Sequence, residues 1–259
     1  MDLEIRDRRA IVCAASKGLG KACATALARE GALVTINARD PAALAATARE
    51  VEEQTGTPVG VVAGDITRPE TRRALLEACP APDILVNNNA GPPPGRFQDW
   101  DRDAWTAALE ANMLAPIEMI RAVIDGMIER RFGRIVNITS AMVKAPLAPM
   151  GLSTGARAGL TSVCKALSQQ VAAANVTINN LLPERIDTDR QLQMARLTAS
   201  LAGISVEEAY ERMREHIPAR RLGRPQEVGD ACAFLCSARV GFITGQNLQL
   251  DGGAYPGLI

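Results

Sequence analysis

Histidine, lysine and tyrosine are all scarce in this chain of 259 residues. It has one histidine, His216, and two tyrosines, Tyr210 and Tyr255. Lysine occurs four times, so the other 25 of the 29 basic residues are arginines. Any reaction that needs an imidazole, a phenol or an amine therefore has few candidate residues.

The six cysteines form no CxxC pair, and with a single histidine they do not predict a zinc site or any other metal site. We expect them to be buried free thiols in a reducing cytoplasm. The N-terminus has no apolar signal-peptide core, and no apolar stretch is long enough to span a membrane. The formal net charge is zero, which gives no reason to expect nucleic acid or an acidic membrane as a partner. These absences predict a soluble cytoplasmic protein. We expect its partner to be a small-molecule substrate.

Short apolar runs alternate along the chain with longer amphipathic ones. The runs that read as strands are 9–15, 32–38, 58–66, 83–91, 133–140, 176–183 and 246–250. The intervening patterns predict helices at 20–31, 41–56, 69–78, 101–113, 115–130 and 153–174, and further helices up to about 238. The strands carry apolar residues on both faces, as strands covered by helices do. The pattern predicts one α/β domain over 1–259, with a Rossmann-type, doubly wound parallel sheet of about seven strands and helices on both faces.

A glycine-containing turn, "CAASKGLGKA", joins the first predicted strand to the first helix. Gly18 and Gly20 let the backbone pass close to a pyrophosphate at the helix N-terminus. The second strand ends with Ala38 and Arg39, where NAD-binding sheets often place an acidic residue. With Lys17 in the glycine turn, two cations and no carboxylate favour the 2′-phosphate of NADP(H) over NAD. The alternative is that both are ordinary surface charges.

At this point the chain resembles the short-chain dehydrogenase/reductase family over essentially its whole length, and it is similar in pattern to 3-oxoacyl-carrier-protein reductases. The matching segments are "AASKGLG" (14–20), "GDIT" (64–67), "NNAG" (88–91), "EANMLAP" (110–116), "GRIVNITS" (133–140), "PERIDT" (183–188) and the C-terminal stretch 222–253. They occur in the family's order, which makes a chance resemblance negligible.

The resemblance implies where cofactor and substrate bind. The cofactor-binding residues it implies, with the two cations above, are Ser16, Lys17, Gly18, Leu19, Gly20, Arg39, Asp65, Ile66, Asn89, Ala90, Gly91, Arg157, Pro183, Ile186 and Thr188. It places Asn112 and Ser140 where the family has its active-site asparagine and serine. It also implies a substrate lid at about 190–220 and a homotetramer.

Two departures from the family pattern lie beside the expected cofactor. Ala14 replaces the first glycine of the loop, so the turn there should avoid a positive φ. Glu184 replaces the glycine after Pro183, where its carboxylate either shapes the site or points to solvent.

The third departure concerns catalysis. The family's YxxxK motif falls, in register, on Ser153 and Arg157, and both tyrosines lie far downstream. In the family the tyrosine donates a proton, while the lysine lowers its pKa and bonds the nicotinamide ribose. A serine hydroxyl titrates far above neutral pH, and an arginine stays protonated, so neither replaces the acid. Arg157 can still supply fixed charge and forked donors.

Three functions are consistent with these residues. The first is an NADP(H)-dependent oxidoreductase acting on a carbonyl, imine or hydroxyl compound, with Asn112, Ser140, Ser153 and Arg157 at its active site and a non-standard proton donor. The second is an NADP(H)-binding sensor or partner subunit, and the third is a lyase or isomerase. Whether Lys144, Glu184 or His216 takes part stays open. A further open point is whether Phe97, Trp100 and Trp105 line a pocket or only pack helices.

Overall fold

The computed structural model describes residues 2–258, which form one seven-stranded sheet in which every strand pair is parallel. The strands are β1 (Arg9–Val12), β2 (Leu33–Ala38), β3 (Val59–Ala63), β4 (Ile84–Asn87), β5 (Gly133–Ile138), β6 (Val176–Pro183) and β7 (Asn247–Leu250). Their spatial order is β3-β2-β1-β4-β5-β6-β7. The chain reverses its direction of growth between β1 and β4, which is where open α/β sheets bind ligands. The predicted fold class is confirmed.

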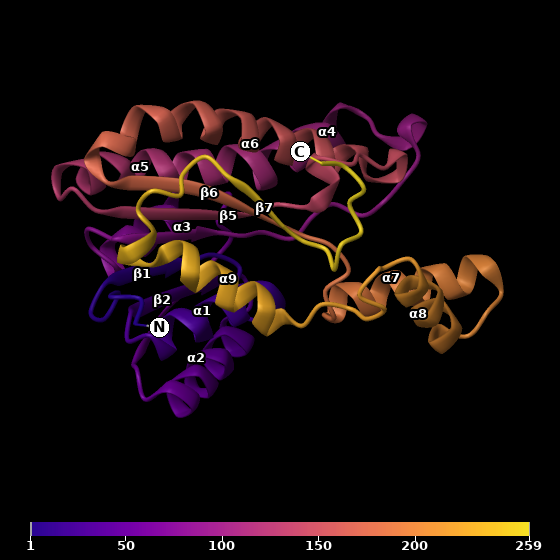
Figure 1. Cartoon of the computed structure of the whole chain (residues 1–259), viewed down its shortest axis with the longest axis horizontal. Helices are drawn as coiled ribbons and strands as arrows, with labels where there is room; N and C mark the ends of the chain where they lie inside the picture. The colour runs from indigo at the N-terminus through magenta and orange to yellow at the C-terminus, as the bar shows by residue number, and fades with distance from the viewer. Residues whose placement is uncertain (1, 259) are drawn as a thin grey trace.

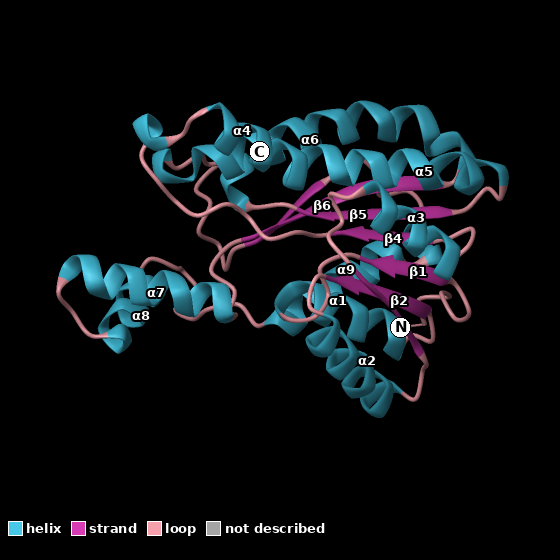
Figure 2. Ribbon diagram, turned by 180° about the vertical axis from the view of Figure 1, so that it is seen from behind, coloured by secondary structure: helices cyan, strands magenta, loops and turns pink. Residues whose placement is uncertain are grey.

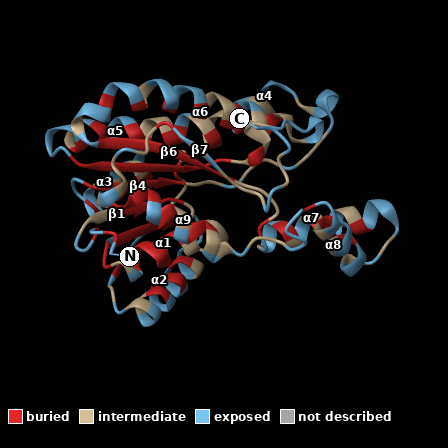
Figure 3. Cartoon of the chain, in the orientation of Figure 1, coloured by how far each residue is buried: buried red, intermediate tan, exposed pale blue. Residues whose placement is uncertain are grey.

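Helices cover both faces of the sheet (Figures 1 and 2). They are α1 (Gly18–Arg29), α2 (Pro41–Thr55), α3 (Pro69–Ala78), α4 (Arg102–Leu109), α5 (Ala115–Glu129), α6 (Gly151–Val171), α7 (Asp189–Ala202), α8 (Val206–Glu215) and α9 (Pro225–Cys236). Side chains of α1, α2 and α9 form one core with the sheet, and those of α3, α5 and α6 form a second core on the opposite face. The central strands are buried between these two layers (Figure 3), which explains why their sequences are apolar on both faces, whereas the edge strands β3 and β7 are partly exposed.

The observed strands end earlier than several predicted ones, because the residues that follow turn away from the sheet. The predicted strand 9–15 stops at Val12, 83–91 stops at Asn87, and 133–140 stops at Ile138. The glycine, asparagine and serine motifs therefore lie in loops at the carboxyl ends of the strands, where they can contact a ligand.

The predicted helices 101–113 and 115–130 are joined without a break. A π-helical turn, η2 (Glu110–Leu114), connects α4 directly to α5. This turn contains Asn112, and π-helical turns occur frequently at functional sites. The predicted boundary is therefore wrong here, because the wider turn continues the helix through this segment.

Helices α7 and α8 stand away from the rest of the molecule (Figure 1). They pack on each other through a small apolar cluster of their own: Ala195, Ala199, Ala209 and Met213. Ser205 caps α8 by accepting a hydrogen bond from the N–H of Glu208 at 3.0 Å. A serine directly before a helix is typically a cap of this kind. Such a pair with little attachment to the main core can move as a unit.

All six cysteines are buried free thiols, as predicted. Burial raises the pKa of the Cys13 thiol to about 12, so it is not a reactive thiolate. Among residues 2–258, no helix combines the length and apolar character that crossing a bilayer requires.

Candidate functional site

The predicted site residues come together at the carboxyl edge of the sheet. The glycine turn follows β1, Arg39 follows β2, Asp65 follows β3, and the asparagine motif 88–91 follows β4. Ser140 follows β5, and the segment 183–188 leaves β6. Because all the strands are parallel, segments distant in sequence meet at one edge of the sheet.

The glycine turn takes a conformation that differs from our expectation at Ala14. Its φ is +48°, whereas we predicted that an alanine there would keep φ negative. Two contacts hold this left-handed alanine: its carbonyl accepts a hydrogen bond from the Asn88 side chain at 3.1 Å, and α1 packs directly on it. A Cβ at Gly20 would lie 2.4 Å from the Ala14 oxygen, so only glycine fits there. Tertiary contacts therefore impose the left-handed conformation that the family assigns to glycine.

The start of α1 is suited to an anion. No side chain caps this helix, and its first turn contains no acidic residue. Gly18 has a φ of +56°, and the Ser16 carbonyl is held by the Thr47 hydroxyl at 2.7 Å. The backbone N–H groups of the first turn are therefore left for a phosphate, while Leu19 packs on the core below them.

Cations and a carboxylate gather beside this helix N-terminus. Lys17 is exposed and pairs with Asp189 of α7 at 3.2 Å. Arg39 is exposed and lies near enough to Asp65 to help lower the pKa of its carboxyl. The main cause of that lowered pKa is the N–H of Thr67, which donates to Asp65 at 3.0 Å, and the Thr67 hydroxyl donates at 2.8 Å. Asp65 is thus a fixed acceptor, with Ile66 buried next to it.

The asparagine motif links β4 to the π-helical turn. The Asn89 side chain donates to the Ala111 carbonyl at 3.1 Å and accepts from the N–H of Ala90 at 2.8 Å. Asn112 is buried, and its amide donates to the Ala108 carbonyl at 3.4 Å. Asn89 therefore holds the loop after β4 against the π-helical turn that carries Asn112, whose own amide bonds within its helix.

Ser153 and Arg157 lie one turn apart on α6, and both are buried, with relative exposures of 3% and 8%. Nη1 of Arg157 donates to the Ser153 hydroxyl, and Nη2 donates to the Asn89 carbonyl at 3.4 Å. Burial, and to a smaller extent the nearby charge of Arg190, lowers the pKa of Arg157 to about 10. At neutral pH the guanidinium stays protonated, so it provides a fixed positive charge but no labile proton.

Ser140 caps a short 3-10 turn, η3 (Ala141–Val143). Its hydroxyl accepts from the N–H of Met142 at 3.3 Å and contacts the Met142 sulfur at 2.9 Å. Lys144 follows this turn; Nζ donates to the Gln249 side chain at 3.3 Å and lies 5.6 Å from the Tyr255 ring centroid. Lys144 therefore has partners in the folded chain and is not only a solvated surface lysine. Its position after η3 is consistent with a role in substrate binding or proton transfer.

The segment after β6 closes the other side of the site. Pro183 pairs with Leu250 in the sheet, and Ile186 is buried against Gly223. Thr188 lies beside the glycine turn, with its Cγ2 3.7 Å from where a Gly18 Cβ would be. The loop after β6 therefore lies close to the loop after β1. One ligand could contact both loops.

Glu184 lies within this segment and is half-buried, with a side-chain exposure of 22%. Burial raises the pKa of its carboxyl; the charge of Arg185 opposes this rise and that of Asp251 adds to it. Of the two alternatives for Glu184, a side chain that simply points to solvent does not fit this burial.

The two tryptophans pack on the first turns of α6. Their rings make an edge-to-face pair with centroids 6.1 Å apart. A Cβ at Gly151 would lie 2.6 Å from the Trp100 ring, and one at Gly155 would lie 3.0 Å from the Trp105 ring. The glycines on either side of Ser153 thus let both indoles contact the helix. Phe97, by contrast, is 72% exposed, although its ring lies 6.5 Å from that of Trp100.

His216 ends α8, where it is exposed and its Nδ1 lies 2.6 Å from the Arg212 carbonyl. This position is at the same end of the α7–α8 pair as Asp189, since the Gln191 side chain of α7 contacts the Met213 sulfur of α8 at 2.9 Å. The contacts of His216 therefore assign it a capping role.

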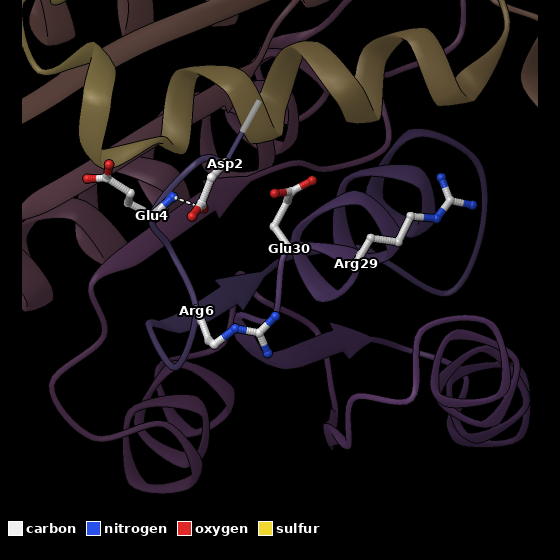
Figure 4. A pocket seen from close by; sticks show the side chains of 5 residues that line it. All are labelled: Asp2, Glu4, Arg6, Arg29 and Glu30. Atoms are coloured by element: carbon white, nitrogen blue, oxygen red, sulfur yellow. Dashed lines mark hydrogen bonds between the residues drawn. The ribbon is translucent and has the colours of Figure 1, made fainter.

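A hollow of about 490 Å³ lies at the N-terminal end of the sheet and is lined by Asp2, Glu4, Arg6, Arg29 and Glu30 (Figure 4). These residues precede β1 or end α1, so they are at the opposite end of the strands from the glycine turn. Their charges are mixed and none belongs to the predicted site.

Arg190 lies at this site, although the sequence pattern does not identify it. Its Nη2 donates to the Pro92 carbonyl at 3.1 Å, and its charge acts on Arg157. The feature of the sequence that could have identified Arg190 is its position two residues after Thr188, at the start of the predicted lid.

Comparisons with known proteins cover nearly the whole chain. A family model described as enoyl-(acyl carrier protein) reductase matches residues 13–255. The NADPH-dependent reductase BacG of Bacillus subtilis (strain 168) is 32% identical over 252 residues, which are 95% of this chain and 97% of that relative. The 3-oxoacyl-(acyl-carrier-protein) reductase FabG of Vibrio cholerae is 31% identical over 259 residues, which are 98% and 99% of the two chains. Among solved structures, L-sorbose reductase from Gluconobacter frateurii, complexed with NADPH and L-sorbose, has a TM-score of 0.94 at 28% identity and full coverage of both chains.

Proposed function

Because the chain belongs to the short-chain dehydrogenase/reductase family, we propose that it is an NADP(H)-dependent oxidoreductase whose active site works without the family's tyrosine. The family predicted from the sequence is confirmed. Relatives named as NADPH-dependent, and the NADPH complex of L-sorbose reductase, support NADP(H) as the cofactor. The substrate is a carbonyl, imine or hydroxyl compound.

The residues at the carboxyl edge fit this cofactor. The uncapped N-terminus of α1 offers N–H groups to a pyrophosphate, and Asp65 is held as an acceptor for the adenine side. Lys17 and Arg39 are exposed cations that a 2′-phosphate can reach, and in this proposal Lys17 exchanges its exposed ion pair with Asp189 for that phosphate. In this proposal Ile186 and Thr188 lie on the nicotinamide side. When bound, the nicotinamide supplies or accepts the hydride.

The observation that carries the proposal is the buried Ser153–Arg157 pair in place of tyrosine and lysine. Arg157 holds positive charge beside the reacting oxygen and donates to the neutral ribose hydroxyls or to a developing oxyanion. Ser140 orients the substrate oxygen through its hydroxyl. A proton then comes from water that reaches the space left by the missing phenol ring, or from the substrate itself where an iminium is reduced.

The same observation supports a second candidate function. Since the Ser153 hydroxyl is bonded to Arg157 and no tyrosine is in register, the chain is alternatively an NADP(H)-binding sensor or partner subunit without hydride transfer. A lyase or isomerase on this fold is a third candidate.

We further propose that α7 and α8 form the substrate lid within the single domain 1–259, supported by their projection from the core (Figure 1) and by the Lys17–Asp189 contact. A homotetramer is supported by exposed apolar residues on α5, α6 and the edge strand β7, namely Ile128, Val163 and Leu248. A cytoplasmic location is supported by six cysteines that form no disulfide among the described residues.

Titration of cofactor fluorescence tests the proposal. The protein should bind NADPH more tightly than NADH, and Arg39→Ala should weaken NADPH about tenfold while leaving NADH binding unchanged, because only NADPH carries the phosphate. Arg49→Ala is the matched control, since Arg49 is an exposed arginine in the body of α2 rather than at the carboxyl edge. Equal affinity for the two cofactors, or binding of neither, would contradict the assignment.

A further inference from the structure

Two arginines converge on one dipeptide at the mouth of the site. A Cβ at Gly91 would lie 3.0 Å from Nη1 of Arg157. Nη2 of Arg190 donates to the carbonyl of the next residue, Pro92, at 3.1 Å. The buried guanidinium of α6 and the exposed guanidinium of α7 therefore approach the same turn from two elements.

Neither arginine has an acidic partner among residues 2–258. No ion pair joins Arg157 or Arg190 to a carboxylate, and the acidic neighbour of Arg190, Asp189, is bonded instead to Lys17. The only charged group that acts on Arg157 with a resolved effect on its pKa is Arg190, which carries the same sign. Two like charges thus lie close together with nothing to neutralise them, although burying an unpaired charge is costly.

Arg134 shows how this protein treats a buried arginine that has a structural role. It is fully buried, and its guanidinium donates to the carbonyl oxygens of Gly133, Asn175, Ser237 and Ala238 and to the Asn175 side chain. Arg157 makes two hydrogen bonds, one of them long, and its Nε has no acceptor among the described residues. Arg134 is satisfied by the fold, whereas Arg157 keeps donors for a ligand.

We infer that the substrate carries a carboxylate, which pairs with Arg157 and Arg190 at the Gly91–Pro92 turn. This inference rests on the proposed function, because it names the class of substrate for the same site. The nicotinamide ribose offers Arg157 only neutral hydroxyls, so the compensating negative charge comes from the substrate. Because Arg190 belongs to α7, a bound carboxylate also links the lid to the catalytic helix.

Binding to the NADP⁺ complex tests this. The probes are three oxo acids, pyruvate, 4-oxopentanoate and 2-oxoglutarate, each compared with its methyl ester by calorimetry. At least one acid should bind about tenfold or more tightly than its ester, since only the acid forms charge-assisted hydrogen bonds with the two guanidinium groups. Arg190→Glu should abolish this preference. Arg196→Glu, which makes the same charge change at another exposed position on α7, should retain it.

Each result decides the question. If NADPH binds but no acid binds better than its ester, the carboxylate inference is overturned while the proposed function stands. If Arg190→Glu and Arg196→Glu weaken the acid equally, the effect is one of general lid charge, and the site at Gly91–Pro92 is refuted. If the protein binds no NADP(H) in the cofactor titration, the proposed function itself fails.

Discussion

Replacing Arg157 by methionine should stabilise the cofactor-free protein. Burial, with a smaller contribution from the charge of Arg190, lowers the pKa of Arg157 from its ordinary value to about 10, and the group is only 8% exposed. Since each pKa unit corresponds to about 1.4 kcal/mol, the charged form costs the folded state about 3 kcal/mol at neutral pH. Losing the hydrogen bonds to Ser153 and Asn89 offsets about 1 kcal/mol. Arg157→Met should therefore raise the free energy of unfolding by about 2 kcal/mol.

The sign of this effect depends on pH. Above about pH 10, and until the arginine of the unfolded chain itself titrates, the unfolded chain holds a proton on Arg157 that the folded protein has lost, so wild-type stability rises with pH in that window. The advantage of Arg157→Met is therefore full below pH 10 and shrinks above it. Urea denaturation of the cofactor-free proteins, followed by circular dichroism at neutral pH and at the highest pH that both tolerate, measures both parts.

Arg134→Met provides the control, because it removes a guanidinium that is equally buried but fully hydrogen-bonded. It leaves the Ser237 and Asn175 carbonyls without their donor and should lower the free energy of unfolding by about 3 kcal/mol. If Arg157→Met destabilises the protein as much as Arg134→Met does, then Arg157 is a structural arginine. The argument for an unsatisfied charge would then be wrong.

Two further changes test the chemistry of the site. The double variant Ser153→Tyr with Arg157→Lys introduces the family's tyrosine acid. It should raise the rate of NADPH-dependent reduction of a simple ketone, ethyl acetoacetate, on the order of 10²-fold over wild type, and Arg157→Lys alone is the control. An unchanged rate would mean that the pocket is shaped for another reaction. Burial raises the pKa of Glu184 in the folded protein above 4.5, so the folded carboxyl keeps a proton that the unfolded chain has released. Wild-type stability therefore falls as pH rises from 4.5 through the folded pKa. Glu184→Gln has no carboxyl to titrate, so this fall in stability should be absent from the variant. Thermal unfolding across that range should give a flatter profile for the variant, and parallel profiles would contradict the raised pKa.

The fold and the edge of the sheet that carries the site could be predicted because they depend on local patterns. Alternating strands and helices dictate a parallel sheet, and a parallel sheet brings the carboxyl ends of its strands together. The places where prediction was wrong depend on contacts between distant segments. Ala14 has a left-handed backbone because Asn88 and α1 hold it, and neither contact is visible in the residues next to Ala14. The π-helical turn at Asn112 likewise continues a helix where the sequence pattern indicates a break.

Arg157 shows where sequence reasoning reaches its limit at this site. Its register predicts that it substitutes for a lysine, but a chain with 25 arginines gives no sign of which ones lack partners. That distinction comes from the tertiary structure. The carbonyls around Arg134 satisfy one buried guanidinium, whereas Arg157 is buried on α6 with few acceptors, and Arg190 of α7 lies near it. A fold selected for stability alone would replace such a charge with an apolar residue. Arg157 instead stays charged and buried beside Ser153, at a cost in folding free energy that can be measured. A binding site for an anion requires this, because the guanidinium must keep its donors available until the ligand binds.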